Sequence, residues 1–220
     1  MLRLRASLDT PALARLAASQ CASLWPDGDL LDASTLLDSA SRAMQRLEHC
    51  FSHINNRYFF NGEQVVFDHL HGDQYAMWLY LLGHQLHLDG GPESWCKKLF
   101  LLNKSLHGCD IYYAVDLPSV FLLVHPLGTV LGRGEYSDFF IAYQRCGIGS
   151  NHDVYPRLGR HVTLRPGSAV LGRSQIGDNV TIAAESLVID RDITSNTTYF
   201  GNPRDHATRP RTTTESIWRI

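Results

Sequence analysis

The chain has 220 residues, of which 44% are hydrophobic and 19% charged, and its formal net charge at pH 7 is −2. This size suits one large or two small globular domains with a sizeable core. The near-neutral charge gives no basic footprint for nucleic acid or an anionic membrane. No apolar run approaches the roughly 18 residues of a membrane-spanning helix. We therefore expect neither nucleic-acid binding nor membrane insertion.

The cysteines and the N-terminus indicate the compartment. The N-terminal stretch has no continuous apolar segment of the signal-peptide kind. The five cysteines are odd in number, widely separated and without the CxxC spacing of metal sites. They are Cys21, Cys50, Cys96, Cys109 and Cys146. A reducing, cytoplasmic location without a bound metal is the simplest interpretation.

Residues 10–109 have helical patterns. Thr10 and Pro11 are suited to the N-cap and first position of a first helix. A second helix is expected from about Ser34, and a buried third helix from the nearly all-apolar segment 73–86. The second has the apolar face Leu36, Leu37, Ala40, Met44, Leu47, Phe51 and Ile54. A fourth has Trp95, Leu99, Leu102 and Leu106 at helical spacing. The segment 55–67 is expected to be irregular or strand-like.

From about residue 110 the period changes to six. Aliphatic residues recur at Leu158, Leu164, Val170, Ile176, Ile182 and Val188. Counting back in sixes gives Ile148, Ala142, Tyr136, Val130 and Val124, a less regular series. The step from Ile148 to Leu158 is ten residues, which predicts that residues 149–157 form a loop pushed out of a regular coil.

A repeat this short is typical of a solenoid in which each unit is a short strand and a turn. The aliphatic residue points to the axis, and Gly, Asn or Asp takes the turn. A flat antiparallel sheet with glycine-rich turns is the alternative. The fold class expected is α+β, a helical N-terminal domain (1–109) followed by a parallel β-helix (110–203) and a C-terminal tail (204–220).

The repeat resembles that of the hexapeptide acyltransferases, whose fold is a left-handed parallel β-helix. The preceding helical half makes the chain similar to the serine O-acetyltransferase type. The likeness covers roughly residues 70–205. It is carried by the segments 71–86, 109–134 ("CDIYYAVDLPSVFLLVHPLGTVLGRG") and 196–205 ("NTTYFGNPRD"). The resemblance implies an acetyl-CoA-dependent O-acetyltransferase.

Acetyl transfer to an alcohol needs a base for the hydroxyl proton and stabilisation of the oxyanion. The resemblance makes His125 the base and Asp110, fifteen residues earlier, the acid that orients its ring. The hydroxyl then attacks the thioester directly. From the residues alone a histidine after an apolar run is usually a packing or turn residue. Asp116 competes with Asp110, and Cys146 is expected to be a small buried residue rather than a nucleophile.

The acceptor site departs from the family. Its second functional histidine is matched by Tyr155 in "YPRL", and the preceding arginine by Val154. His152 is a candidate substitute, or it is simply solvated. Asp73 is the nearest candidate for the acidic residue that holds the serine amine, although an aspartate at a helix start is more often a cap. Serine and a hydroxyl of a capsular or other surface polysaccharide are both candidate acceptors.

The resemblance places the acetyl-CoA arm along the outside of the coil. Small side chains at Ala183, Ala184 and Gly201 would permit that approach. Arg204, and also Arg209 and Arg211, could bind its phosphates or could simply be solvated. The family forms trimers, with active sites between neighbouring coils, and serine acetyltransferases pair them into dimers of trimers. We therefore expect a homotrimer or a dimer of trimers.

Two further hypotheses come from other classes. A non-catalytic β-helix could act as a binding or scaffolding subunit, against which the Asp110–His125 spacing argues. A metal enzyme of the γ-carbonic anhydrase type would need three histidines converging between subunits. His125, His152 and His161 are available, but their sequence context does not resemble that family.

Overall fold

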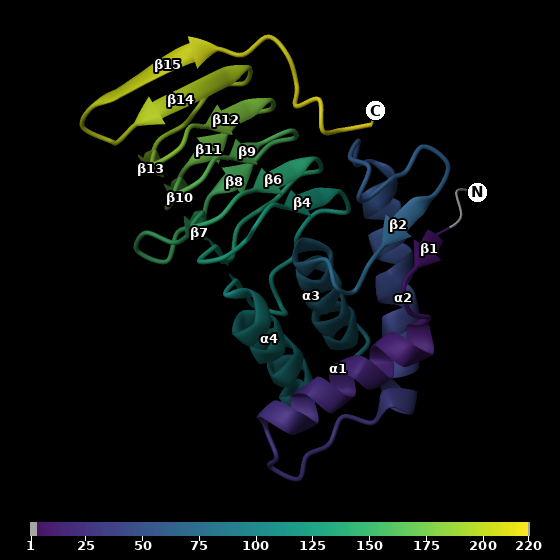
Figure 1. The fold of residues 1–220 in the computed structure, drawn as a ribbon. Coiled ribbons are helices and arrows are strands. Elements are labelled where there is room, and N and C mark those ends of the chain that lie inside the picture. Colours follow the sequence, from purple (N-terminus) through teal and green to yellow (C-terminus); the bar gives the residue numbers. More distant parts are fainter. Residues whose placement is uncertain (1–3, 220) are drawn as a thin grey trace. The chain divides into compact units, whose positions relative to one another are not determined.

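The computed structural model describes residues 4–219, which form two compact units (Figure 1). The helical unit comprises the chain up to His107, together with Tyr112–Ala114 and Arg219. The coil unit comprises Gly108–Ile111 and Val115–Trp218. Within residues 4–219, no helix combines the length and apolar character needed to cross a membrane.

The helical unit contains the four expected helices and a two-stranded parallel sheet. The helices are α1 (Thr10–Leu24), α2 (Ala33–Ser52), α3 (Gly72–Leu88) and α4 (Glu93–His107), and the strands are β1 (Leu4–Ala6) and β2 (Val65–Phe67). The N-cap expected for the first helix, Thr10, was wrong. The N-cap of α1 is Asp9, whose carboxylate accepts the Ala12 N–H at 2.8 Å, so Thr10 is already the first helical residue.

Helix α3 forms the centre of the helical unit, as its apolar composition predicts. Every residue from Gln74 to Leu86 is buried, and α3 packs against both α2 and α4. The buried Gln74 amide is paired at both ends: it donates to the Tyr58 carbonyl at 2.7 Å and accepts the Asp68 N–H at 2.7 Å. Burial of this amide is therefore tolerated because protein partners replace its hydrogen bonds to water.

The coil unit is built from three stacks of short parallel strands, which we call faces 1, 2 and 3 (Figure 1). Face 1 contains β3 (Asp110–Ile111), β5 (Val130–Leu131), β7 (Gly147–Gly149), β10 (Ala169–Leu171) and β13 (Leu187–Ile189). Face 2 contains β4 (Phe121–Leu123), β6 (Phe140–Ala142), β9 (Thr163–Leu164), β12 (Val180–Ile182) and β14 (Thr197–Gly201), with β15 (His206–Pro210) antiparallel at its edge. Face 3 contains β8 (Arg157–Leu158) and β11 (Gln175–Ile176).

The aliphatic repeat fills the interior of the coil. All six residues of the regular series are at most 4% exposed, and Val170 pairs with Val188 in the next layer. Burial of each such side chain contributes about 1.5–3 kcal/mol before the entropy cost of ordering it. Because every layer stacks the same residue type on the last, the core is continuous along the axis. The expected α+β architecture, helices followed by a parallel β-helix, is confirmed.

The less regular series was wrong at two positions. Val130 is 48% exposed, whereas Leu131 is 1% exposed and continues the interior ladder from Ile111 to Ile148. Leu123, rather than Val124, is the fully buried residue one strand earlier. Leu131 and Ile148 are 17 residues apart and Leu123 and Ala142 are 19 apart, so a count based on eighteen-residue layers goes one residue too far back in the first case and stops one short in the second.

The segment expected to be a tail folds onto the coil. Strand β15 pairs with β14, and beyond it the Glu215 carboxylate accepts from Arg165 at 2.7 Å. The Trp218 ring meets the Phe139 ring edge-on, with centroids 5.4 Å apart. Arg211 lies 3.3 Å from the same Glu215 carboxylate and is partly buried. It is therefore not the solvated cation that the sequence left open.

Candidate functional site

The turns that lead from face 2 to face 1 form one edge of the coil, which we call the histidine corner. It comprises residues 124–129, 143–146, 165–168 and 183–186, together with residues 108–110, which lead into face 1 and stack on the first of these turns. Thr129 locks the first two turns together, because its buried hydroxyl donates to the Tyr143 carbonyl at 2.6 Å and accepts the Cys146 N–H at 3.2 Å. The corner is thus a stack of turns with fixed backbone positions.

His125 and Asp110 belong to the same corner. His125 is exposed and has a left-handed backbone, with φ of 48°, and its carbonyl accepts the Leu127 N–H at 2.7 Å. In the same turn, the Gly128 N–H donates to the Gly108 carbonyl at 2.8 Å. Asp110 is half-buried, and its N–H donates to the Thr129 carbonyl at 2.8 Å. The strand pairing therefore stacks the Asp110 segment on the turn that begins with His125.

Asp116 and Cys146 are placed differently. Asp116 is exposed in the segment between β3 and β4. Cys146 is 1% exposed, and burial raises the pKa of its thiol, so that the reactive thiolate is disfavoured. The expectation that Cys146 is a packing residue is confirmed.

The loop 149–157 is confirmed as an insertion in the coil. The layer from Ile148 to Val170 spans 22 residues instead of eighteen. Asn151 and Val154 exchange two backbone hydrogen bonds across His152 and Asp153, whose φ values are 50° and 59°. Two consecutive left-handed residues make a type I′ turn, which the Asn-His-Asp-Val sequence supports because Asn, His and Asp tolerate that conformation.

His152 is exposed and Tyr155 is half-buried in this loop. The loop leaves face 1 at the end of β7, whereas His125 precedes β5. Because the strands of face 1 are parallel, these two groups lie at opposite edges of that face. One chain therefore stacks the segment of Asp110 on the turn of His125, whereas His152 and Tyr155 lie at the other edge of the face.

Asp73 lies in the first turn of α3, within the helical unit. It is half-buried, and the N-cap of that helix is His71, which makes no capping hydrogen bond through its side chain. Burial lowers the pKa of His107, and the nearby Asp73 carboxylate opposes that shift. Asp73 is thus not the cap that its position at the helix start suggested.

The small residues proposed for the donor lie further along the histidine corner. Ala184 is exposed, and the half-buried Ala183 donates its N–H to the Tyr199 carbonyl at 2.9 Å. The Gly201 N–H donates to the Ser186 hydroxyl at 3.0 Å. Gly201 has φ of 96°, and a Cβ there would lie 2.3 Å from the Asp205 carbonyl oxygen, so only glycine fits. Arg204 is exposed in the turn that follows.

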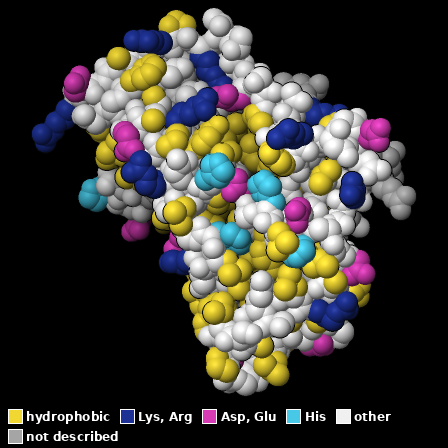
Figure 2. Space-filling model, viewed as in Figure 1, with side chains coloured by type: hydrophobic (Ala, Val, Ile, Leu, Met, Phe, Trp, Pro, Cys, Tyr) yellow, Lys and Arg dark blue, Asp and Glu magenta, His cyan; other side chains and the backbone are white. Residues whose placement is uncertain are grey.

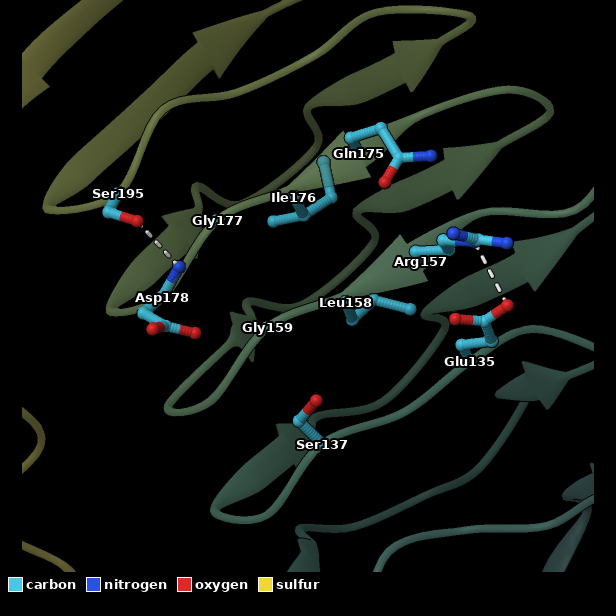
Figure 3. Close-up of a pocket in the computed structure, with 10 residues that line it drawn as sticks. All are labelled: Glu135, Ser137, Arg157, Leu158, Gly159, Gln175, Ile176, Gly177, Asp178 and Ser195. Carbon is cyan, nitrogen blue, oxygen red and sulfur yellow. Dashed lines mark hydrogen bonds and ion pairs between the residues drawn. The ribbon is translucent and has the colours of Figure 1, made fainter.

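Sequence reasoning missed a shallow cleft of about 330 Å³ on face 3 (Figure 3). Its rim carries Gln175, Asp178 and Ser195, and the Arg157 Nε and Glu135 Oε1 atoms form an ion pair at 2.9 Å. Its floor runs along Gly159 and Gly177, where Cβ atoms would collide with the next turn. The glycines were visible in the sequence, but only the stacking of layers makes a cleft of them.

Within residues 4–219, no three His, Cys, Asp or Glu side chains converge in a way that could hold a metal ion. On the face shown in Figure 2, basic and acidic side chains are interspersed rather than gathered into one patch. This distribution agrees with the near-neutral formal charge.

No protein-family model matches the chain. Curated proteins with a similar sequence were found. The serine acetyltransferase of Synechococcus elongatus is 33% identical over 107 residues, 46% of this chain and 43% of that protein. That of Staphylococcus epidermidis is 26% identical over 134 residues, 59% of this chain and 62% of that protein. The chain thus spans about half the length of the curated relatives it matches.

Solved structures agree over nearly the whole chain. The serine acetyltransferase of Neisseria gonorrhoeae superposes with a TM-score of 0.70 and 19% identity, covering 94% of this chain and 80% of that one. The Brucella abortus serine acetyltransferase in complex with coenzyme A superposes with a TM-score of 0.70 and 19% identity, covering 95% of this chain and 85% of that one. The chain therefore has the hexapeptide-repeat, left-handed β-helix fold of the serine acetyltransferases, and its sequence is similar to theirs.

Proposed function

We propose that the chain is an acetyl-CoA-dependent O-acetyltransferase, with serine as the leading acceptor. The observation that carries this proposal is the shared position of His125 and Asp110 on the histidine corner. A neutral imidazole is a competent base near pH 7. His125 would take the hydroxyl proton of the acceptor while Asp110 holds the ring in the required tautomer. The hydroxyl oxygen would attack the thioester carbonyl, and coenzyme A would leave.

The corner beyond His125 suits a long, thin donor. Residues 183–184 offer only methyl side chains there, so backbone is accessible to a pantetheine arm. Arg204, exposed past the last strand, is a candidate partner for the donor phosphates. The support from relatives is that one solved structure of this fold is described as a complex with coenzyme A.

The acceptor site needs more than one copy of the chain under this proposal. His152 and Tyr155 lie across face 1 from His125. In a trimer with sites between neighbouring coils, His152 and Tyr155 of one copy would face His125 of the next. We therefore propose a homotrimer, with a dimer of trimers as the larger assembly. Asp73 remains the candidate for the serine amine.

A saccharide hydroxyl is the second candidate acceptor. Val154 and Tyr155 take the places where the family has arginine and histidine, and Val154 is 44% exposed. At these two positions the loop 149–157 therefore lacks the cationic and imidazole groups of the family. In favour of serine, the Neisseria gonorrhoeae structure of this fold is also described in complex with serine.

The test is coenzyme A release from acetyl-CoA by the purified protein, with His125→Ala beside it. The acceptors are L-serine, L-homoserine and a de-O-acetylated surface polysaccharide. Serine-dependent release that is lost in the variant supports the proposal. Release with the polysaccharide alone moves the assignment to the second candidate. Equal rates in wild type and variant exclude His125 as the base.

A further inference from the structure

The histidine corner contains a column of four left-handed residues. Gly128, Arg145, Gly167 and Glu185 occupy equivalent places in successive layers and have φ values of 74°, 57°, 74° and 58°. Each non-first member of the column donates its backbone N–H to a carbonyl in the turn before it. The bonds are Arg145 to Leu127 at 3.0 Å, Gly167 to Gln144 at 3.0 Å and Glu185 to Pro166 at 2.9 Å. Each turn is therefore fixed against the turn before it.

Arginine and glutamate are unusual in this conformation. Within residues 4–219, ten non-glycine residues have positive φ, and seven of these are Asn, Asp or His. Those types tolerate the left-handed region better than others do. The other three are Phe139, which is buried, and the exposed pair Arg145 and Glu185. Two surface positions thus keep a side chain where glycine would be less strained.

The side chains of Arg145 and Glu185 reach across Gly167 and form an ion pair. A Cβ at Gly167 would lie 2.5 Å from a Glu185 carboxylate oxygen, so glycine leaves room for the pair. Both side chains are more than 60% exposed. An exposed ion pair stabilises a fold by less than two left-handed non-glycine residues destabilise it. Stability therefore does not account for the pair, and residues held in strained conformations concentrate at functional sites.

The backbone of Arg145 lies beside the turn that carries His125. Its N–H is bonded to Leu127, and a Cβ on Gly128 would lie 3.3 Å from the Arg145 Cγ. Its guanidinium already binds a carboxylate, that of Glu185. We propose, on the basis of the proposed function, that Arg145 binds the carboxylate of the acceptor and that Glu185 occupies the guanidinium until the acceptor arrives. The acceptor class is then an amino acid with a hydroxyl group, not a neutral sugar.

Two variants with opposite expected effects test this exchange. Arg145→Gln removes the guanidinium group that would pair with the acceptor carboxylate. The KM for L-serine should therefore rise roughly 10- to 100-fold, while the KM for acetyl-CoA stays unchanged. Glu185→Gln removes the internal competitor, and the KM for L-serine should fall about two- to fivefold. L-serinamide, which lacks the carboxylate, should respond weakly to either change.

The pair Arg157 and Glu135 is a matched control (Figure 3). It also joins two layers of the coil, adjacent ones in this case, and is similarly exposed, at 61% and 68%, but it lies on face 3. Arg157→Gln and Glu135→Gln should leave the KM for L-serine unchanged. Equal effects of the two arginine substitutions would mean a general effect of charge and would overturn the assignment.

Failure of the two proposals is distinguishable. A wild-type protein without serine-dependent turnover contradicts the proposed function itself. An active wild type in which Arg145→Gln leaves the KM for L-serine unchanged contradicts only the role of Arg145. A rise in the KM for acetyl-CoA instead would assign Arg145 to the donor and overturn the acceptor role. A rise in the KM for L-serine on Glu185→Gln would make the pair structural.

Discussion

The Asn151 amide donates a 2.6 Å hydrogen bond from Nδ2 to Oδ2 of the Asp190 carboxylate. This bond ties the tip of the loop 149–157 to a turn two layers further along the coil. Gly172 lies in the layer between them, and its N–H donates to the Gly149 carbonyl at 3.1 Å. The loop that carries His152 and Tyr155 is thereby held against the coil rather than left free in solvent.

Gly172→Ala should destabilise the coil by roughly 2–3 kcal/mol. Its φ is 69°, and a Cβ would lie 2.1 Å from the Asp190 Oδ1 and 2.8 Å from the Asn151 Cβ. Gly90→Ala is the control, because φ is 74° and no atom lies within 4 Å of the added Cβ. Urea unfolding of both variants should show the larger loss for Gly172→Ala. Equal losses would mean that backbone strain alone matters.

Asp190→Asn should loosen the loop without unfolding the coil. The Asp190 carboxylate accepts from the Arg173 N–H at 2.8 Å and from Asn151, and these bonds lower its pKa. Amide exchange of residues 150–155 at pH 7 should become several-fold faster, while the urea midpoint of unfolding stays close to that of the wild type.

Asp192→Asn is the control for this loop variant. Its carboxylate also accepts a backbone N–H from a neighbouring layer, but the donor is Gln175, at 3.1 Å, and not a residue of the loop. Amide exchange of residues 150–155 should be unchanged in Asp192→Asn. Faster exchange in both variants would indicate that the whole edge of the coil, not the Asn151–Asp190 bond, holds the loop.

Asp110→Asn should lower the kcat of the proposed acetyl transfer by at least roughly tenfold. An amide in place of the carboxylate would stabilise the imidazolium less and could favour the wrong tautomer. Asp116→Asn, an exposed position outside the histidine corner, should retain wild-type kcat. Initial rates at saturating acetyl-CoA distinguish the two. A larger loss in Asp116→Asn would reverse the assignment of the acid.

Stability should fall in mild acid, partly because of His161. Its ring stacks on the Phe139 ring with centroids 4.4 Å apart, and burial, followed by Arg160 and Arg211, lowers its pKa. His161 therefore binds a proton more readily in the unfolded chain than in the folded chain. As a result, the free energy of unfolding decreases as the pH falls below about 6.5 towards the lowered pKa of the folded chain. Above that window this contribution is constant.

Urea unfolding at pH 7.5 and pH 5.5 checks the role of His161. His161→Asn keeps a residue suited to the left-handed backbone, for which φ is 60°. The difference in free energy between the two pH values should be smaller in the variant than in the wild type. Part of it should remain, because burial also lowers the pKa of His107 in the helical unit. An unchanged difference would exclude His161 as a source.

The sequence predicted the parts of the fold that depend on neighbouring residues. The six-residue period identified the interior positions from Leu158 to Val188, and the ten-residue step located the loop after Ile148. Both follow from local geometry, since each unit must return an aliphatic side chain to the axis. The same rule failed at Val130, because the length of a layer is decided by how its corners stack and not by the strand itself.

The site shows the same division. His125 and Asp110 were expected from the family resemblance, and their spacing, close to one turn of the coil, agrees with the strand pairing that stacks their segments. Arg145 and Glu185 were not found, because forty residues separate them and nothing in their local sequence connects them. Only the stacking of layers, with glycine at residue 167 leaving the space between, brings these two charges together. A periodic sequence thus determined which residues face inward, while the corners of the coil, built from residues distant in the chain, decided which polar side chains meet outside.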